Sequence, residues 1–136
     1  MDCYTNAWGY EQAAVDLLST GRYQQSIFLC CLAVELYLKS KLHLVPHDDD
    51  LETSHDVIRI YNALTSRYQP KTNHKLMIVR CRKYFNESRY PSAVDVSVYT
   101  KDFASEFIDF VAAIRDFIDN ECVATIDDLK GKYSDD

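Results

Sequence analysis

The sequence predicts an all-α protein, an up-and-down antiparallel bundle of four main helices plus one additional helix. Two observations predict this class. Apolar residues recur every three or four positions through most of the 136 residues, which is the spacing of one helix face. Of the three glycines and three prolines, four fall between these periodic stretches, namely Gly21, Pro46, Pro70 and Pro91. A chain of this length is expected to fold around a single core, and no repeat of solenoid length is visible.

The first two expected helices span about 5–19 and 22–44. Thr5 or Asn6 can cap the start of the first, and Gly21 ends it. The second is apolar nearly all round, so we expect it to be the central helix. Its two apolar stripes are Ile27, Cys31, Val34, Leu38 and Leu42, and Phe28, Leu32 and Leu36.

One polar pair stands out in this central helix. Glu35 and Lys39 are four residues apart and therefore share a helix face. Their simplest role is a salt bridge that spans one turn. A polar pair in such an apolar helix is unusual, which makes it a candidate for a site.

The third and fourth expected helices span about 54–68 and 72–86. A solvated loop at 46–52 precedes the third helix, and either Thr53 or Ser54 can cap it. The fourth is a basic helix with a narrower apolar side. The inward residues are expected to be Val57, Ile60, Tyr61 and Leu64 in the third helix and Met77, Cys81 and Tyr84 in the fourth.

The C-terminal part contains one more long helix. Alternating valines in 87–100 are typical of a short strand, but the chain offers no partner strand, so we expect an ordered loop. The helix that follows spans about 101–122 and completes a bundle domain at 1–122. Residues 123–136 are expected to form a short acidic helix or tail. The seam of the long helix is Phe103, Phe107, Phe110, Ile114 and Phe117.

Charge is distributed unevenly along the chain, whose net charge is −6. Between 67 and 89, seven basic residues are opposed by Glu87 alone, whereas from 102 onward ten acidic residues are opposed by three basic ones. The acidic total argues against broad nonspecific nucleic-acid binding. The segment 67–89 is either one basic surface on an acidic molecule or a solvated helix face, and both readings stay open.

Several familiar classes of site are not expected. The five cysteines are an odd number without a Cys-x-x-Cys pair, so we expect thiols that fill the core. His43 and His47 have zinc-ligand spacing, but Pro46 disfavours a helix through both, so we expect no metal and no cofactor. The chain has neither a glycine-rich phosphate loop nor a Gly-x-Ser-x-Gly elbow. Without an apolar run of about 18 residues or a secretory signal, we expect a cytoplasmic protein that does not contact membranes.

Four short motifs follow one another through the first hundred residues. They are Trp8 with 13–18, the segment 21–39 ending in Ala-Val-Glu-Leu-Tyr-Leu-Lys, Thr-Ser-His-Asp-Val at 53–57, and Ser-Arg-Tyr-Pro at 88–91. In this order they resemble the HEPN domain family, the nucleotide-binding domain of higher eukaryotes and prokaryotes, in its Arg-Tyr-Pro branch. The resemblance implies a helical bundle that homodimerises and works beside a separately encoded nucleotidyltransferase.

The resemblance also bears on catalysis, because many HEPN relatives are toxins that cut RNA without a metal. In them a Glu or Asn, followed after three residues by Lys or Arg, supports an Arg that is followed after four to six residues by His. Glu35 and Lys39 match the first half. After Arg89, however, positions 94–96 hold Val, Asp and Val. Metal-free cleavage needs a group that titrates near neutral pH, so we expect no catalytic activity here.

Two alternatives to a binding module remain. Arg67 and His74 have the required spacing, with six residues between them, although Pro70 and a helix junction separate them. They would be the catalytic pair of a metal-independent RNA-cleaving toxin in a toxin–antitoxin pair. The second alternative is a purely structural dimerisation bundle in which the seam of Phe103, Phe107 and Phe110 meets a copy of itself.

The leading hypothesis is a non-catalytic module that binds nucleotide or RNA phosphate and pairs with a nucleotidyltransferase or with itself. Arg89 can contact phosphate, Tyr90 can stack on a base, and Lys39 adds a charge. Alternatively, Arg89 pairs with Glu35 inside the bundle, and His55 helps to cap the third helix. Both readings place Glu35 and Arg89 side by side. The expected ligand residues are Lys39, Arg89 and Tyr90, supported by Glu35, His55 and Pro91.

Overall fold

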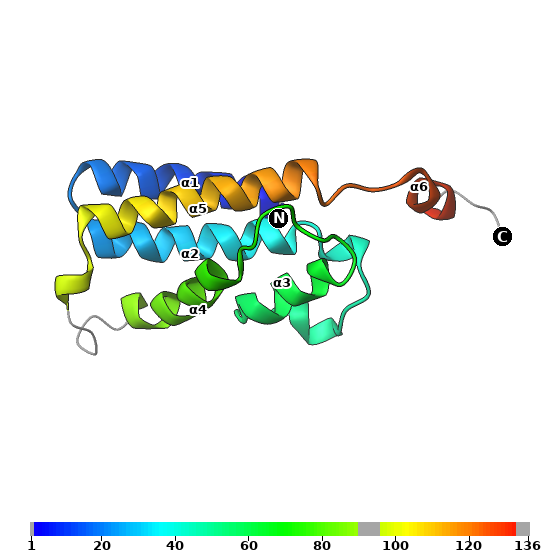
Figure 1. The fold of residues 1–136 in the computed structure, drawn as a ribbon, viewed down its shortest axis with the longest axis horizontal. Helices are drawn as coiled ribbons and strands as arrows, with labels where there is room; N and C mark the ends of the chain where they lie inside the picture. The colour runs from blue at the N-terminus through cyan, green and yellow to red at the C-terminus, as the bar shows by residue number, and fades with distance from the viewer. Residues whose placement is uncertain (1, 90–95, 133–136) are drawn as a thin grey trace.

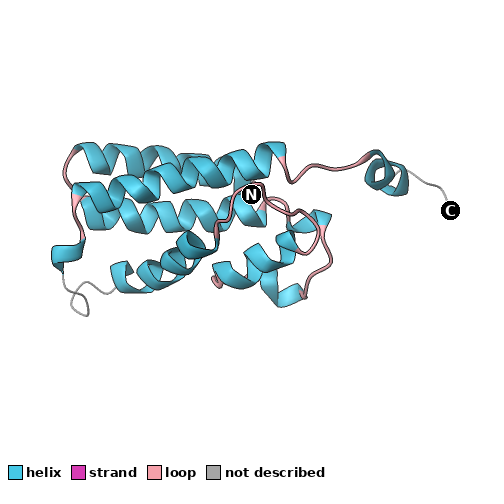
Figure 2. Ribbon diagram, viewed as in Figure 1, coloured by secondary structure: helices cyan, strands magenta, loops and turns pink. Residues whose placement is uncertain are grey.

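The structure, a computed structural model, describes residues 2–89 and 96–132, with side chains throughout except at 88, 89, 129, 131 and 132. Every regular element in these ranges is a helix, which confirms the predicted all-α class (Figure 2). The four main helices are α1 (Cys3–Ser19), α2 (Tyr23–Lys39), α4 (Lys75–Arg89) and α5 (Lys101–Asn120). They alternate in direction, and the shorter α3 (Val57–Thr65) packs beside α2 and α4 (Figure 1). Among the described residues, no helix is long and apolar enough to cross a membrane.

Both ends of α1 are fixed by local hydrogen bonding. The helix starts earlier than predicted, because Asp2 caps it instead of Thr5 or Asn6: the Asp2 carboxylate accepts from the Tyr4 N–H at 2.9 Å. A carboxylate is favoured there by the positive end of the helix dipole. At the other end Gly21 has φ 78°, a left-handed conformation that suits glycine and ends the helix as predicted.

The central position of α2 is borne out by its contacts, because it packs against α1, α3, α4 and α5. It is shorter than the predicted 22–44. The α-helix ends at Lys39, where the Ser40 hydroxyl donates to the Tyr37 carbonyl at 2.6 Å, and the chain then forms a 3-10 turn, η1 (Leu42–Leu44). Its buried residues are Ser26, Ile27, Cys30, Cys31, Ala33, Val34, Glu35, Tyr37 and Leu38.

The start of α3 also differs from the prediction. Neither Thr53 nor Ser54 caps the helix; Asp56 does, and its carboxylate accepts from the Ile58 N–H at 3.2 Å. Ser54 instead accepts from the Asp56 N–H at 3.0 Å and holds the capping residue. The helix therefore begins at Val57, after the acidic 3-10 turn η2 (Asp49–Glu52).

The helix α4 is shifted by three residues relative to the predicted 72–86. It begins where the Asn73 side chain accepts from the Lys75 N–H at 3.0 Å, and it continues to Arg89. Residues 90–95 lie outside the described part of the chain. The Val-Ser-Val segment beyond them is a 3-10 turn, η4 (Val96–Val98), and not a strand.

The aromatic seam of α5 belongs to the core of one chain. The helix begins at Thr100, whose hydroxyl accepts from the Phe103 N–H at 3.1 Å. Phe107 and Phe110 are 0% and 6% exposed, so a single chain already covers them. This burial speaks against the alternative in which these rings meet a second copy. The buried residues of α5 are Ala104, Phe107, Phe110, Val111, Ile114, Phe117 and Ile118.

The segment after α5 forms a short helix, α6 (Ile126–Lys132), which lies beyond the end of the bundle (Figure 1). Two side chains that follow α3 contact α6 and the segment just before it. The Arg67 guanidinium pairs with Asp128 at 2.6 Å, and the Tyr68 hydroxyl donates to the Val123 carbonyl at 3.2 Å. The predicted short helix or tail is thus a helix over these residues.

The cysteines lie mostly inside the bundle. Cys30, Cys31, Cys81 and Cys122 are buried, and Cys3 is half-buried. Burial raises the pKa of the Cys122 thiol to about 12. Such thiols stay protonated near neutral pH, which fits small core residues better than nucleophiles.

Candidate functional site

A buried carboxylate on α2 joins two basic side chains. The Glu35 side chain is 6% exposed, and its Oε2 pairs with Lys39 Nζ at 3.2 Å, as the four-residue spacing predicts. The same carboxylate also contacts His55, whose Nδ1 lies 3.1 Å from Oε1 and 3.2 Å from Oε2. We call Glu35, Lys39 and His55 the Glu35 cluster.

The His55 ring is held by stacking as well as by this hydrogen bond. It lies 5.6 Å from the Phe85 ring at an interplanar angle of 26°, and Phe85 stacks in turn on Phe28 at 5.4 Å and 24°. The stack therefore links α2, α4 and the residues just before α3. The alternative reading, in which His55 helps to cap α3, is wrong, because Asp56 is the cap and His55 contacts Glu35.

The two basic side chains of the cluster differ in exposure. The His55 side chain is 62% exposed, whereas the Lys39 side chain is 9% exposed. A carboxylate can only accept hydrogen bonds, so Nδ1 carries a proton and the other ring nitrogen, Nε2, is an acceptor whenever the ring is neutral. The exposed imidazole is therefore the member of the cluster that can meet a ligand in solvent.

More positive charge lies near the cluster on α4. Arg82 Nε is 3.9 Å from Asp56 Oδ1, which places a half-exposed guanidinium next to the residue that follows His55. On the other side, Lys39 lines a cavity of about 210 Å³ together with His43 and Glu52. The cluster thus lies between a small cavity and a basic helix.

The remaining predicted ligand residues lie at the edge of the described structure. Arg89 is the last residue of α4, one helical turn after Phe85, and its side chain is outside the described part. Tyr90 and Pro91 also lie outside it. The proximity of Glu35 and Arg89 therefore stays a prediction, although Glu35 already has two basic partners.

The alternative catalytic pair has separate surroundings. Arg67 donates to the Leu44 carbonyl at 2.6 Å and pairs with Asp128 at the same distance. His74 is 5% exposed and lies among the rings of Tyr61, Phe110 and Phe117. Burial lowers the pKa of His74, although the charge of Glu121 acts in the opposite direction. A buried imidazole in an aromatic cage is poorly placed to meet an RNA strand.

His47, one of the two histidines with zinc-ligand spacing, is held by contacts with neighbouring protein groups. His47 Nδ1 lies 2.8 Å from the Val45 carbonyl, and its Nε2 lies 3.2 Å from Glu52 Oε1. The contact with Val45, followed by that with Glu52, raises the pKa of His47. Within the described ranges, no group of three or more His, Cys, Asp or Glu side chains could hold a metal ion.

For His55, which the sequence predicts as a supporting residue, the structure provides the partner Glu35 and the stacked ring of Phe85. His55 and Glu35 are 20 residues apart, and no local periodicity connects them. The only signal in the sequence is the Thr-Ser-His-Asp-Val motif, which marks the position of His55 without giving its partner.

The fold and the Glu35 cluster define a small helical-bundle protein with a polar site on its central helix. The family model of the HEPN domain matches residues 1–121, and the chain belongs to the HEPN domain family. The match ends just after α5, so α6 lies beyond it. Comparison with curated proteins and with solved structures found no match.

Proposed function

We propose that this HEPN domain binds the phosphate of a nucleotide or RNA at the Glu35 cluster, without cutting it. Membership of the HEPN family indicates a function related to nucleotides or RNA. The proposal that phosphate binds at the Glu35 cluster rests on the exposed imidazole of His55, which is fixed by a buried carboxylate. Pairing with a separately encoded nucleotidyltransferase or with a second copy belongs to the same proposal and rests on the resemblance alone.

A phosphate would meet His55 first. In its protonated form the ring donates from Nδ1 to Glu35 and keeps Nε2–H for a phosphate oxygen. The positive charge of that form would then lie between two negative groups, the Glu35 carboxylate and the phosphate. The side chain of His55 loses little conformational entropy on binding, because the Phe85 ring already restricts it.

Lys39 would act mainly at a distance. Its ammonium is 9% exposed and already paired with Glu35, so it contributes charge to the site more than direct contact. Arg82 lies beside Asp56 at the start of α3 and can turn toward a bound phosphate. Arg89 and Tyr90, four and five residues after Phe85 in the sequence, would supply a forked guanidinium and a stacking ring.

Binding is tested by titrating fluorescently labelled ATP and a short labelled RNA against the full chain. His55→Ala and Arg89→Ala should each weaken binding about fivefold or more, because each removes a charge-assisted hydrogen bond. Lys101→Ala is the matched control, since it removes an exposed cation at the start of α5. Negligible binding by the wild type, or equal loss in the control, would reject the proposal.

One observation favours cleavage as a second candidate function. A carboxylate bound to Nδ1 and a solvent-facing Nε2 are the arrangement in which an imidazole acts as a general base. In this role His55 Nε2 would take the proton of an RNA 2′-hydroxyl while that oxygen attacks the adjacent phosphorus. The 5′-oxygen would then leave with a proton from water. His55 would thereby replace the histidine that positions 94–96 lack.

A single RNA cleavage assay distinguishes the two candidate functions. RNA incubated with the protein in EDTA stays intact if the site only binds, whereas cleavage that disappears in His55→Ala would establish His55 as the base. Loss of cleavage in His74→Ala, with His55→Ala unaffected, would instead favour the pair Arg67 and His74. If cleavage causes growth arrest on expression, the variant that loses cleavage should also lose the growth arrest.

A further inference from the structure

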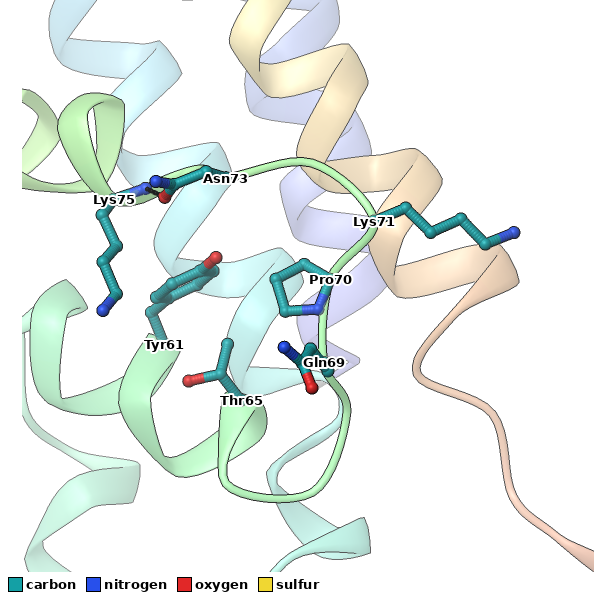
Figure 3. Close-up of a pocket in the computed structure, with 7 residues that line it drawn as sticks. All are labelled: Tyr61, Thr65, Gln69, Pro70, Lys71, Asn73 and Lys75. Atoms are coloured by element: carbon teal, nitrogen blue, oxygen red, sulfur yellow. Dashed lines mark hydrogen bonds between the residues drawn. The ribbon is translucent and has the colours of Figure 1, made fainter.

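A groove runs between α3 and α4, and its polar end lies at the far end of α3 from the Glu35 cluster. Its polar end is a cavity of about 570 Å³ lined by Tyr61 and Thr65 from α3, Gln69 and Asn73 from the connecting loop, and Lys75 from α4 (Figure 3). This volume is within the range of sites for small molecules, about 300–1,000 Å³. Thr65 ends α3 and His55 precedes it, so this polar cavity and the Glu35 cluster lie at opposite ends of that helix.

The groove continues along α4 with a different character. A second cavity of about 190 Å³ shares Tyr61 and Lys75 with the first, so the two cavities are adjacent. Its other lining residues include Ile58, Ile78 and Val79. Val79 is 52% exposed, which leaves apolar surface open at this end. We call both cavities together the Lys75 groove.

Lys75 is the cation that the groove offers to a ligand. Its side chain extends along the edge of the cavity beside Tyr61, whereas the Lys71 side chain points away from Tyr61 and Thr65 (Figure 3). Arg67 and Arg82 have carboxylate partners at 2.6 and 3.9 Å, but Lys75 has no ion pair among the described residues. It is therefore free to pair with an added anion.

The surroundings of Lys75 favour negative charge. It is the first residue of α4, a helix of 15 residues whose positive dipole end faces this part of the groove. The side-chain amides of Gln69 and Asn73 can supply further hydrogen bonds. One carboxylate lies near the rim, where Glu121 accepts from the Lys71 N–H at 2.8 Å.

We propose that the Lys75 groove binds a small amphipathic anion, with a carboxylate or phosphate head at Lys75 and a short apolar chain along Ile58, Ile78 and Val79. The polar end accounts for the head and the apolar end for the chain. Each alone would be weak, because an exposed lysine contributes little and the apolar cavity is small. A ligand that spans both gains from each end at once. The proposal is independent of phosphate binding at the Glu35 cluster.

The test is an amide-resolved NMR titration of the full chain with octanoate and octyl phosphate. Acetate, inorganic phosphate and octanol serve as probes of the head and the chain separately. Both amphipathic probes should shift the amide signals of Thr65, Gln69 and Asn73 and bind at least tenfold more tightly than any of the three partial probes. Tighter binding of one amphipathic probe identifies the head group as carboxylate or phosphate.

Variants of exposed residues make the test specific. Lys75→Ala should weaken octanoate binding about fivefold, and Val79→Ser should weaken it about threefold. Lys101→Ala, the control for loss of one positive charge, should have no effect. The proposal fails if the amphipathic probes shift no groove amides, if octanol binds as tightly as octanoate, or if Lys101→Ala acts like Lys75→Ala. None of these outcomes depends on whether ATP or RNA binds near His55.

Discussion

Replacing Glu35 by Gln should strongly destabilise the protein, because it leaves a buried ammonium without its counter-charge. The side chains of Glu35 and Lys39 are 6% and 9% exposed and lie 3.2 Å apart. Removing one partner of a buried pair costs about 3–5 kcal/mol. The amide carbonyl introduced by Glu35→Gln can still accept from Lys39, so we expect about 3 kcal/mol, the lower end of that range.

This loss is large enough to measure by heat or urea. With an unfolding entropy of about 2 cal/mol/K per residue, a chain of 136 residues has about 0.3 kcal/mol/K, so the expected decrease in Tm is about 10 °C. Lys39→Met should lose a similar amount, since it leaves the Glu35 carboxylate with His55 alone. The double variant should lose at least about 2 kcal/mol less than the sum of the single variants, because neither charge then remains buried.

An exposed pair in the same chain is the matched control. Arg59 and Asp50 approach to 3.3 Å, but their side chains are 44% and 68% exposed. The same cycle with Asp50→Asn and Arg59→Met should give a coupling energy below about 1 kcal/mol. Urea unfolding monitored by circular dichroism at pH 7 measures both cycles. Additive effects of Glu35→Gln and Lys39→Met would refute the reasoning.

Two further predictions concern α3 and the buried histidine. Burial lowers the pKa of His74 below its ordinary value of 6.5. As the pH falls, the unfolded chain therefore binds a proton at this residue before the folded chain does. The free energy of unfolding is thus highest above pH 6.5 and decreases as the pH falls toward the pKa of the folded state. In urea titrations His74→Phe should therefore lose less stability than the wild type between pH 7.5 and 5.5; equal losses would contradict this. At the start of α3, Asp56→Ala should cost about 1 kcal/mol and Ser54→Ala less, in thermal unfolding. The reverse order would mean that Ser54 is the cap.

Helical periodicity is local, which is why the sequence alone predicts the class of fold. The residues that form one face of α2 or α5 are fixed by backbone geometry, whatever they pack against. The ends of helices are harder to predict, because several neighbouring side chains can compete for the same cap. Asp2 and Asp56 cap α1 and α3 in place of the Thr, Asn and Ser residues predicted as caps. In α2 the helix ends at the cap residue Ser40, before the apolar pattern stops.

The candidate site also has one part that the sequence predicts and one part that it does not. The pair Glu35 and Lys39 follows from a spacing of four residues within one helix. The contact between Glu35 and His55 spans 20 residues and needs α3 to be placed against α2. The ring of Phe85, which comes from α4, then fixes the imidazole. No spacing of residues along the sequence predicts these two contacts of His55.

By itself, the sequence determined the all-α class, the order of the main helices, the ion pair on the central helix and the resemblance to HEPN domains. Only the tertiary structure decided that the exposed His55 would contact the buried Glu35, that His74 would be enclosed by aromatic rings, and that α3 and α4 would leave a groove beside Lys75. The physical reason is the range of the interactions. Hydrogen bonds within a helix repeat at fixed short spacing, whereas exposure and long-range contact depend on how whole helix faces pack together.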